Sequence, residues 1–479
     1  MKYNSIDDIR LWIILKKKPY FIHMNQKTFL TTRFTDDLYQ LLVKACVDDL
    51  KKSEKKIKNI KVEVIKLRKI PDIKFLLKCV IYFLQGKFFF RKKIILLKYE
   101  DINFGKHLFT FTLRNYESYL SSYKFYYHLI VNIYVISKIF KTADYYLKHC
   151  RFEDIYIDHL GYLNGIFYQI FISKNKRIYT NCYPRNVLKI KNKKLKDIFK
   201  LDFKKVNFSN VKQEKIIKKT KKIFRNGNNS LFWMDDAKYN LLKKQNFKKY
   251  DYIIYTHSFT DSQLLYGYDG FLDTLEWLEF TTKELQNRKV NFIIKAHPNF
   301  YTKSFGDIAS WDRKIYTNFF KKIKDDRNIL VINESILNSD LIKLLNKKCV
   351  AITKHGNAQL EMVHNNFKVI SSKCNYLDHK YKLFNTWGNK KDYKKLLNQK
   401  WDKLKFCNKK NYLNVINRLY LDEDAFYGDN FYMHILQRYM IKERLAKKDA
   451  TIFDVVKKFN SLNNKKDIVD KINVPVIKF

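Results

Sequence analysis

Paired cysteines, long apolar runs and internal repeats are all missing from this 479-residue sequence. Its seven cysteines are scattered, and none belongs to a Cys-x-x-Cys pair. This pattern argues against a structural zinc site and favours a reducing compartment. No repeat period is visible, which argues against a solenoid.

The apolar segments are too short to cross a membrane. The most apolar one, Phe75 to Phe90, contains Lys78, Gly86 and Lys87, so it is too short and too charged to span a bilayer. Lysines at positions 16–18 interrupt the first apolar run, and we therefore expect no signal peptide. The expectation is a cytoplasmic protein, with peripheral association at the inner face of the cytoplasmic membrane as an option.

Acidic residues are scarce relative to basic ones. The chain has 95 Lys and Arg against 47 Asp and Glu, a formal net charge of +48. Such a charge suggests nucleic acid or an anionic membrane surface as a partner. However, Lys, Asn, Ile, Phe and Tyr are abundant together, while there are only 11 glycines and 5 prolines. This joint skew indicates a composition bias of the source genome. Because RNA-binding motifs and zinc-finger spacing are absent, we expect no specific nucleic-acid partner.

The length of the chain predicts more than one domain, and its 46% hydrophobic residues can fill sizeable cores. From residue 250 onward, short apolar strands alternate regularly with helices, which predicts a doubly wound α/β domain. We expect an N-terminal domain with a linker over residues 1–235 and a C-terminal domain over 236–400. Residues 401–479 are expected to form a helical extension, and the whole region after 380 is predicted to be mainly helical.

One stretch, Val290 to Phe300, carries the first functional signal. It begins as a short apolar run typical of a strand buried on both faces. The strand should end at Lys295-Ala-His297-Pro298, because proline cannot donate to a strand ladder. A lysine and a histidine at the carboxyl end of such a strand suit a phosphate. The alternative is a strand that simply ends in two solvated polar residues with no ligand.

A second stretch, Cys349 to Met362, repeats this arrangement. A buried strand leads to Lys354, His355, Gly356 and Asn357 at the same sheet edge. Gly356 leaves room for a ligand near the backbone, and Asn357 is a suitable N-cap for a helix whose amino terminus favours anions. Glu361, one turn along, could accept both ribose hydroxyls of a nucleotide. The alternative is an ordinary turn with Glu361 complementing the helix dipole.

A third strand, 252–256, runs into the polar segment that contains His257, Ser258 and Asp261. Because carboxyl ends of parallel strands share one edge, we expect this segment to face the same crevice. All three strand ends together form the predicted donor site.

The N-terminal half contains a strand–helix–strand unit over residues 153–184, which predicts parallel strands. Asp158, His159 and Tyr162 lie in the turn at the carboxyl end of its first strand.

Nearer the N-terminus, Ile94 to Tyr99 is predicted to be a strand. Gly105, one of few glycines, is expected to meet a backbone need such as a turn with positive φ, and Arg114 lies downstream of it.

Several of these motifs together resemble bacterial capsule and surface-polysaccharide glycosyltransferases of GT-B fold. They are THSFTDSQ, Leu275-Glu-Trp-Leu278, IIKAHPN and KHGNAQLE, in an order and spacing that match over about residues 250–376. HLGYLNGIF (159–167) and INFGKHLFTFTLR (102–114) are similar to the family's amino-terminal domain, less specifically. The chain departs from the family at Asn357, where Ser or Thr is usual, and at Asn365-Asn366, which replace a small residue.

The resemblance implies two Rossmann-like doubly wound domains that face a cleft, with a helical C-terminal extension. It implies a sugar transfer from a CMP- or UDP-sugar donor to a surface polysaccharide or lipid-linked glycan acceptor, either inverting or retaining. His297 and Gly356-Asn357 match the residues that contact donor phosphate in the family. No convincing Asp-x-Asp metal site is seen, so neither a metal nor a bound cofactor is expected.

The remaining roles are hypotheses. Asp158 or His159 is the candidate catalytic base for an inverting reaction. Gly105, Arg114 and Tyr162 are candidates for the acceptor side. Three alternatives stay open: transfer of glycerophosphate or ribitol phosphate from a CDP-alcohol, binding of nucleic acid, and a catalytically inactive scaffold.

Overall fold

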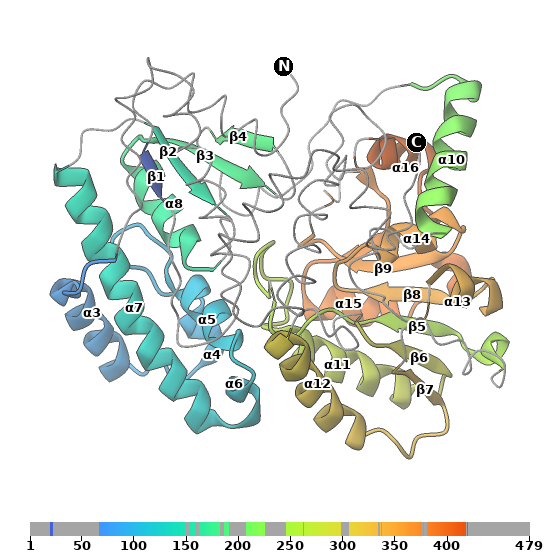
Figure 1. The fold of residues 1–479 in the computed structure, drawn as a ribbon. Helices are drawn as coiled ribbons and strands as arrows, with labels where there is room; N and C mark the ends of the chain where they lie inside the picture. Colours follow the sequence, from blue (N-terminus) through green and yellow to red (C-terminus); the bar gives the residue numbers. More distant parts are fainter. Residues whose placement is uncertain are drawn as a thin grey trace, which may run out of the picture.

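The structure is a computed structural model. It describes residues 20–22, 67–149, 154–158, 162–182, 186–190, 207–225, 246–261, 263–297, 306–333, 338–375 and 381–417, and the single residues 336, 377 and 419. Figure 1 shows two sheets, which lie in two halves of the molecule.

The C-terminal half contains a six-stranded parallel sheet. Its strands are β5 (Tyr252–Tyr255), β6 (Phe292–Lys295), β7 (Ile329–Ile332), β8 (Val350–Thr353), β9 (Lys368–Ser372) and β10 (Asn385–Trp387). Their spatial order is β10-β9-β8-β5-β6-β7, and every neighbouring pair is parallel. The chain therefore builds outward from β5 in one direction and then restarts at β8 on the other side. This is the doubly wound order, and its switch point lies between β5 and β8.

Helices cover both faces of this sheet, because alternate strand residues point to opposite sides. Ile253, Ile293 and Ala351 belong to one core with helices α10 (Asn210–Arg225), α13 (Asn338–Leu344), α14 (Ala358–His364) and α16 (Lys409–Ile416). Ile254 and Ile294 belong to a second core with α11 (Thr274–Asn287), α12 (Gly306–Lys321) and α15 (Lys390–Leu397). The short 3-10 helices 247–249 and 401–403 lie at the ends of this unit. Figure 1 shows α11 and α12 on one side of the sheet and α14 and α16 on the other.

The N-terminal half contains a four-stranded sheet in the order β1-β2-β3-β4. Strands β1 (Tyr20–Ile22), β2 (Asp154–Asp158) and β3 (Arg177–Cys182) are parallel, while β4 (Asn186–Ile190) is antiparallel to β3. The predicted strand–helix–strand unit is confirmed, with α8 (Asn164–Ser173) between β2 and β3. Whether this half is a second doubly wound domain, and where the domain boundaries lie, stay predictions.

The helices of this half share an aromatic core. They are α3 (Ile73–Leu84), α4 (Arg91–Ile94), α5 (Gly105–Leu113), α6 (Glu117–Leu120) and α7 (Ser122–His149). Phe75 on α3 contacts the rings of Tyr99, Phe104 and Phe140 edge-on or tilted at 4.9–5.2 Å. Such aromatic pairs stabilise a core beyond their buried area. Among the described residues, no helix is long and apolar enough to span a bilayer.

Two local predictions, a strand over residues 94–99 and a positive φ at Gly105, are wrong. Residues 94–99 are not a strand: they include the end of α4 and a turn, and Tyr99 makes only an isolated bridge to Ile102. The described part of the region after residue 380 is mainly helical, as expected, and β10 adds a short edge strand to the parallel sheet. Gly105 does not need a positive φ. It opens α5, and a Cβ there would lie 1.9 Å from the carbonyl oxygen of Ile94, so close packing is its requirement.

Candidate functional site

Three histidines meet at the carboxyl edge of the parallel sheet. His257 follows β5, His297 follows β6 and His355 follows β8. The ring centroid of His257 lies 4.1 Å from that of His355 and 5.2 Å from that of His297. The His257–His355 pair spans the switch point between β5 and β8, where open α/β sheets bind their ligands. The predicted convergence of the three strand ends is therefore confirmed.

All three imidazoles are held in the neutral form. Burial lowers the pKa of His297 to about 3, and the neighbouring His257 contributes to that shift. Burial also lowers the pKa of His257, and it lowers the pKa of His355 well below the ordinary value. A neutral imidazole still offers one N–H donor and one acceptor. The cluster can therefore donate hydrogen bonds to an anion while the charge is supplied by nearby lysines.

Lys354 and His355 have unused polar atoms. Among the described residues, neither ring nitrogen of buried His355 has a hydrogen-bond partner, and the same holds for Lys354 Nζ. Lys354 Nζ does lie 3.5 Å from Asp269 Oδ1, as an ion pair without hydrogen-bond geometry. Buried polar groups are nearly always hydrogen-bonded, so these donors are available to a ligand at the sheet edge.

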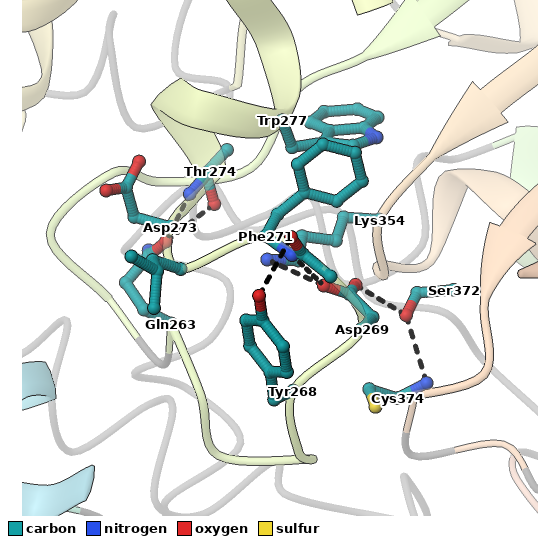
Figure 2. Close-up of polar contacts among 12 residues, drawn as sticks. Gln263, Tyr268, Asp269, Phe271, Asp273, Thr274, Trp277, Lys354, Ser372 and Cys374 are labelled. Carbon is teal, nitrogen blue, oxygen red and sulfur yellow. Dashed lines mark hydrogen bonds and ion pairs between the residues drawn. The ribbon is translucent and has the colours of Figure 1, made fainter. Parts of the chain in front are cut away.

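Asp269 holds the Lys354 side chain from a loop far away in the sequence. It accepts hydrogen bonds from Ser372 Oγ at 2.6 Å and from the backbone N–H of Phe271 at 3.2 Å. Figure 2 shows Lys354 and Ser372 converging on this carboxylate, with Cys374 N donating in turn to Ser372 Oγ. No local sequence pattern marks Asp269 as the partner of Lys354, which lies 85 positions later, and Asp269 was therefore not among the predicted site residues.

Lys295 and Glu361 form a second buried pair near the cluster. Burial lowers the pKa of Lys295 to about 8, while Glu361 opposes that shift. Burial raises the pKa of Glu361 to about 7, opposed by a hydrogen bond from Asn338 Nδ2 at 2.8 Å and by Lys295. Near neutral pH this pair therefore sits close to its titration range.

Asp312 fixes the loop that carries His257, a role that no local sequence pattern indicates. Its carboxylate accepts from Ser258 Oγ at 2.5 Å, from the backbone N–H groups of Phe259 and Thr260 at 3.1 Å, and from Thr260 Oγ1 at 3.1 Å. Ser258, expected to bind the donor, is buried in this contact and positions the loop. Burial raises the pKa of Asp312 to about 7 in spite of these hydrogen bonds.

Gln263 ties the same loop to the start of α11. Its amide nitrogen donates to the backbone oxygens of Ser258 and Asp261 at 2.9 and 2.7 Å. Its amide oxygen accepts from the N–H and the hydroxyl of Thr274 at 2.6 and 2.8 Å (Figure 2). Both hydrogen-bonding ends of one buried side chain are thus used to hold the loop.

Gly356 and Asn357 follow His355 at the edge. Gly356 has a φ of +127°, which favours glycine, and a Cβ there would meet no atom within 4 Å. Space in front of the backbone is therefore open, as a ligand would need. Asn357 occupies the N-cap position of α14, but its side chain makes no cap hydrogen bond, so the predicted capping is wrong.

The two halves of the molecule meet beside Asp261. Tyr162 donates its hydroxyl to Asp261, and the guanidinium of Arg114 lies 4.3 Å from the centroid of the Tyr162 ring. Tyr119 Oη donates to the backbone oxygen of Phe259 at 2.5 Å. The candidate acceptor-side residues Arg114 and Tyr162 therefore lie next to the loop that follows β5.

Other candidate residues are not tested by these contacts. His159 and Pro298 lie outside the described residues, and Asp158 is described only as the last backbone position of β2. Gly105 packs inside the N-terminal half and has a structural role there. No group of three or more His, Cys, Asp or Glu in the described ranges is placed to hold a metal ion.

Comparison with known proteins gives distant structural matches only. No family model matches the chain, and no curated protein matches it. One similar solved structure is KpsC of Thermosulfurimonas dismutans, a beta Kdo 2,4 transferase. It is 9% identical, covers 55% of this chain and 78% of its own, and has a TM-score of 0.33. Another is the UDP-GlcNAc 2-epimerase of Methanocaldococcus jannaschii, solved with UDP-GlcNAc and UDP. It is 12% identical, covers 84% of this chain and 98% of its own, and has a TM-score of 0.27.

Proposed function

We propose that this chain is a glycosyltransferase that uses a nucleotide-activated sugar and binds the donor at the histidine cluster. The observation that carries the proposal is the meeting of His257, His297 and His355 at the switch point of a doubly wound parallel sheet. Lys354 and His355 add buried donors that lack hydrogen-bond partners among the described residues. Hydrogen-bond donors and cations at this edge suit the phosphates of a nucleotide.

In this proposal the acceptor hydroxyl attacks the anomeric carbon of the donor, and the bond between that carbon and the phosphate oxygen breaks. Charge then develops on the leaving phosphate. Preorganised donors in a water-poor site stabilise such charge most strongly. The imidazole N–H groups and the ammonium groups of Lys295 and Lys354 supply that stabilisation, so the step does not require a metal.

The acceptor side belongs to the N-terminal half in this proposal. Arg114 and Tyr162 lie beside Asp261, on the route from the donor loop to that half. The hydroxyl proton would pass to Asp158, the last residue of β2, or to His159, the next residue in the sequence. The donor would be a CMP- or UDP-sugar, and the acceptor a surface polysaccharide or a lipid-linked glycan.

The experiment is an assay of nucleotide release from a panel of CMP- and UDP-sugars, with and without glycan acceptors. His297→Ala should lower the rate by about tenfold or more, since it removes a donor to the leaving phosphate. The matched control is His364→Ala, which removes another partly buried histidine, one that hydrogen-bonds Tyr412 on α16 instead. Release from CDP-glycerol alone would support the CDP-alcohol alternative. Equal rates for wild type and His297→Ala would refute the site.

A further inference from the structure

Helix α3 is apolar on two opposite faces. Phe75, Cys79 and Tyr82 point into the core of the N-terminal half. The other side of the same helix also carries large apolar residues, and these are exposed to solvent. They recur at helical spacing with exposed fractions of 65, 59, 54 and 79%: Ile73, Leu77, Val80 and Leu84. A surface helix of a monomeric soluble protein normally has polar residues at such positions.

Exposed apolar residues continue beyond this helix. The segment after α3 adds Phe89 and Phe90, each more than half exposed. Helix α7 packs against α3 and presents its own exposed row at the same spacing, Tyr123, Tyr127, Ile130 and Tyr134. Figure 1 shows α3 and α7 next to each other at the outer edge of the N-terminal half. Apolar patches of this extent mark interaction sites.

The charge around this apolar face indicates its partner. Residues 67–98 contain nine basic residues and one acidic residue, Asp72, which caps α3. Lys74 and Lys78 are exposed next to the apolar row, and Lys92 and Lys93 are exposed beside Phe90. Apolar side chains flanked by Lys and Arg, with tyrosines alongside, suit the interface of an anionic bilayer, where rings and stems enter the lipid while cations meet headgroups.

The geometry points to a membrane-docking surface formed by α3, residues 85–93 and the exposed row of α7, which binds anionic lipid bilayers. The protein would lie on the membrane rather than span it. This surface is separate from the histidine cluster, so it does not depend on the proposed reaction. Docking there would hold the N-terminal half at a lipid-bound substrate.

Flotation of the full chain with lipid vesicles tests this inference. Wild type should float with phosphatidylglycerol-containing vesicles and much less with pure phosphatidylcholine vesicles. Leu77→Gln/Leu84→Gln should weaken binding by about a hundredfold or more, because each leucine that enters the lipid contributes roughly a tenfold change in affinity or more. Lys74→Glu/Lys78→Glu should also weaken vesicle binding, and the remaining binding should depend less on the salt concentration than that of wild type.

The matched control for Leu84→Gln is Val211→Gln on α10, because the two side chains are almost equally exposed, at 79% and 78%, and Val211 lies outside the proposed surface. Only Leu84→Gln should reduce flotation. The inference is overturned if wild type does not bind anionic vesicles, or if Leu77→Gln/Leu84→Gln binds them as wild type does. It is also overturned if sedimentation velocity shows a dimer that this variant dissociates while vesicle binding is absent, since the surface would then join two copies of the chain.

Discussion

Replacing Asp312 tests how the loop that follows β5, residues 256–261, is held in place. One carboxylate accepts four hydrogen bonds from three consecutive residues, 258–260, directly after His257. Asp312→Ala leaves these buried donors without partners. Each such donor costs about 1–3 kcal/mol, so the lower end of the range for four donors is on the order of 4 kcal/mol of stability.

Asp312→Asn is the matched control. Oδ1 accepts three of the four bonds, and an amide oxygen in its place can keep them. The new amide group can donate to the hydroxyl of Ser258, which then rotates to accept. Burial of a charge is also relieved, because burial raises the pKa of this carboxyl to about 7. We therefore expect Asp312→Asn to stay within about 1 kcal/mol of wild type.

Urea denaturation followed by tryptophan fluorescence measures both variants, and nucleotide binding is measured on the folded proteins. Asp312→Ala should unfold at lower urea and bind nucleotide more weakly, since the loop after β5 loses its anchor. Equal losses for Ala and Asn, or a loss below about 1 kcal/mol for Ala, would refute the reasoning.

Three further predictions concern the same region. Removing one partner of the buried Lys354–Asp269 pair, by Lys354→Met or Asp269→Asn, should cost about 3–5 kcal/mol in denaturation, and the double variant should recover part of that loss. Gly270→Ala should destabilise more than Gly356→Ala: φ is positive at both, but only at Gly270 would a Cβ approach a backbone nitrogen, at 2.6 Å; equal costs would contradict this. Burial raises the pKa of Glu361 from 4.5 to about 7, so the folded state retains a proton that the unfolded chain has lost. Its contribution to stability is present below pH 4.5 and is lost as the pH rises to about 7, roughly 3–4 kcal/mol in all. Glu361→Gln should remove this part of the pH dependence when the free energy of unfolding is measured at several pH values.

The C-terminal sheet could be predicted from the sequence because its strands are buried on both faces. Runs such as 252–255 and 350–353 are apolar, are rich in β-branched or aromatic residues and are followed by polar residues, and this pattern predicts both the strand and the residue at which it ends. Parallel pairing then brings His257, His297 and His355 to one edge without further information. The position of the three histidines therefore follows from local sequence patterns.

The carboxylates that hold this site in place could not be predicted, because they contact residues far away in the sequence. Asp312 serves residues more than 50 positions earlier, and Asp269 meets Ser372 across 103 positions. The prediction of a strand over residues 94–99 is wrong, because a few consecutive apolar residues fit a buried turn after a helix as well as they fit a strand. The exposed row of α3 was also invisible, because the periodic pattern of a helix does not reveal which of its two apolar faces meets the core.

Calorimetric titration of wild type and His297→Ala with CMP, CDP, UDP and GDP tests whether the histidine cluster binds a nucleotide. We expect one of these nucleotides to bind wild type, His297→Ala to lose most of the affinity, and His364→Ala to retain it. If no nucleotide binds wild type, and polyanions bind instead with a steep dependence on salt, the strand-edge site is not a donor site and the +48 charge becomes the better guide to function.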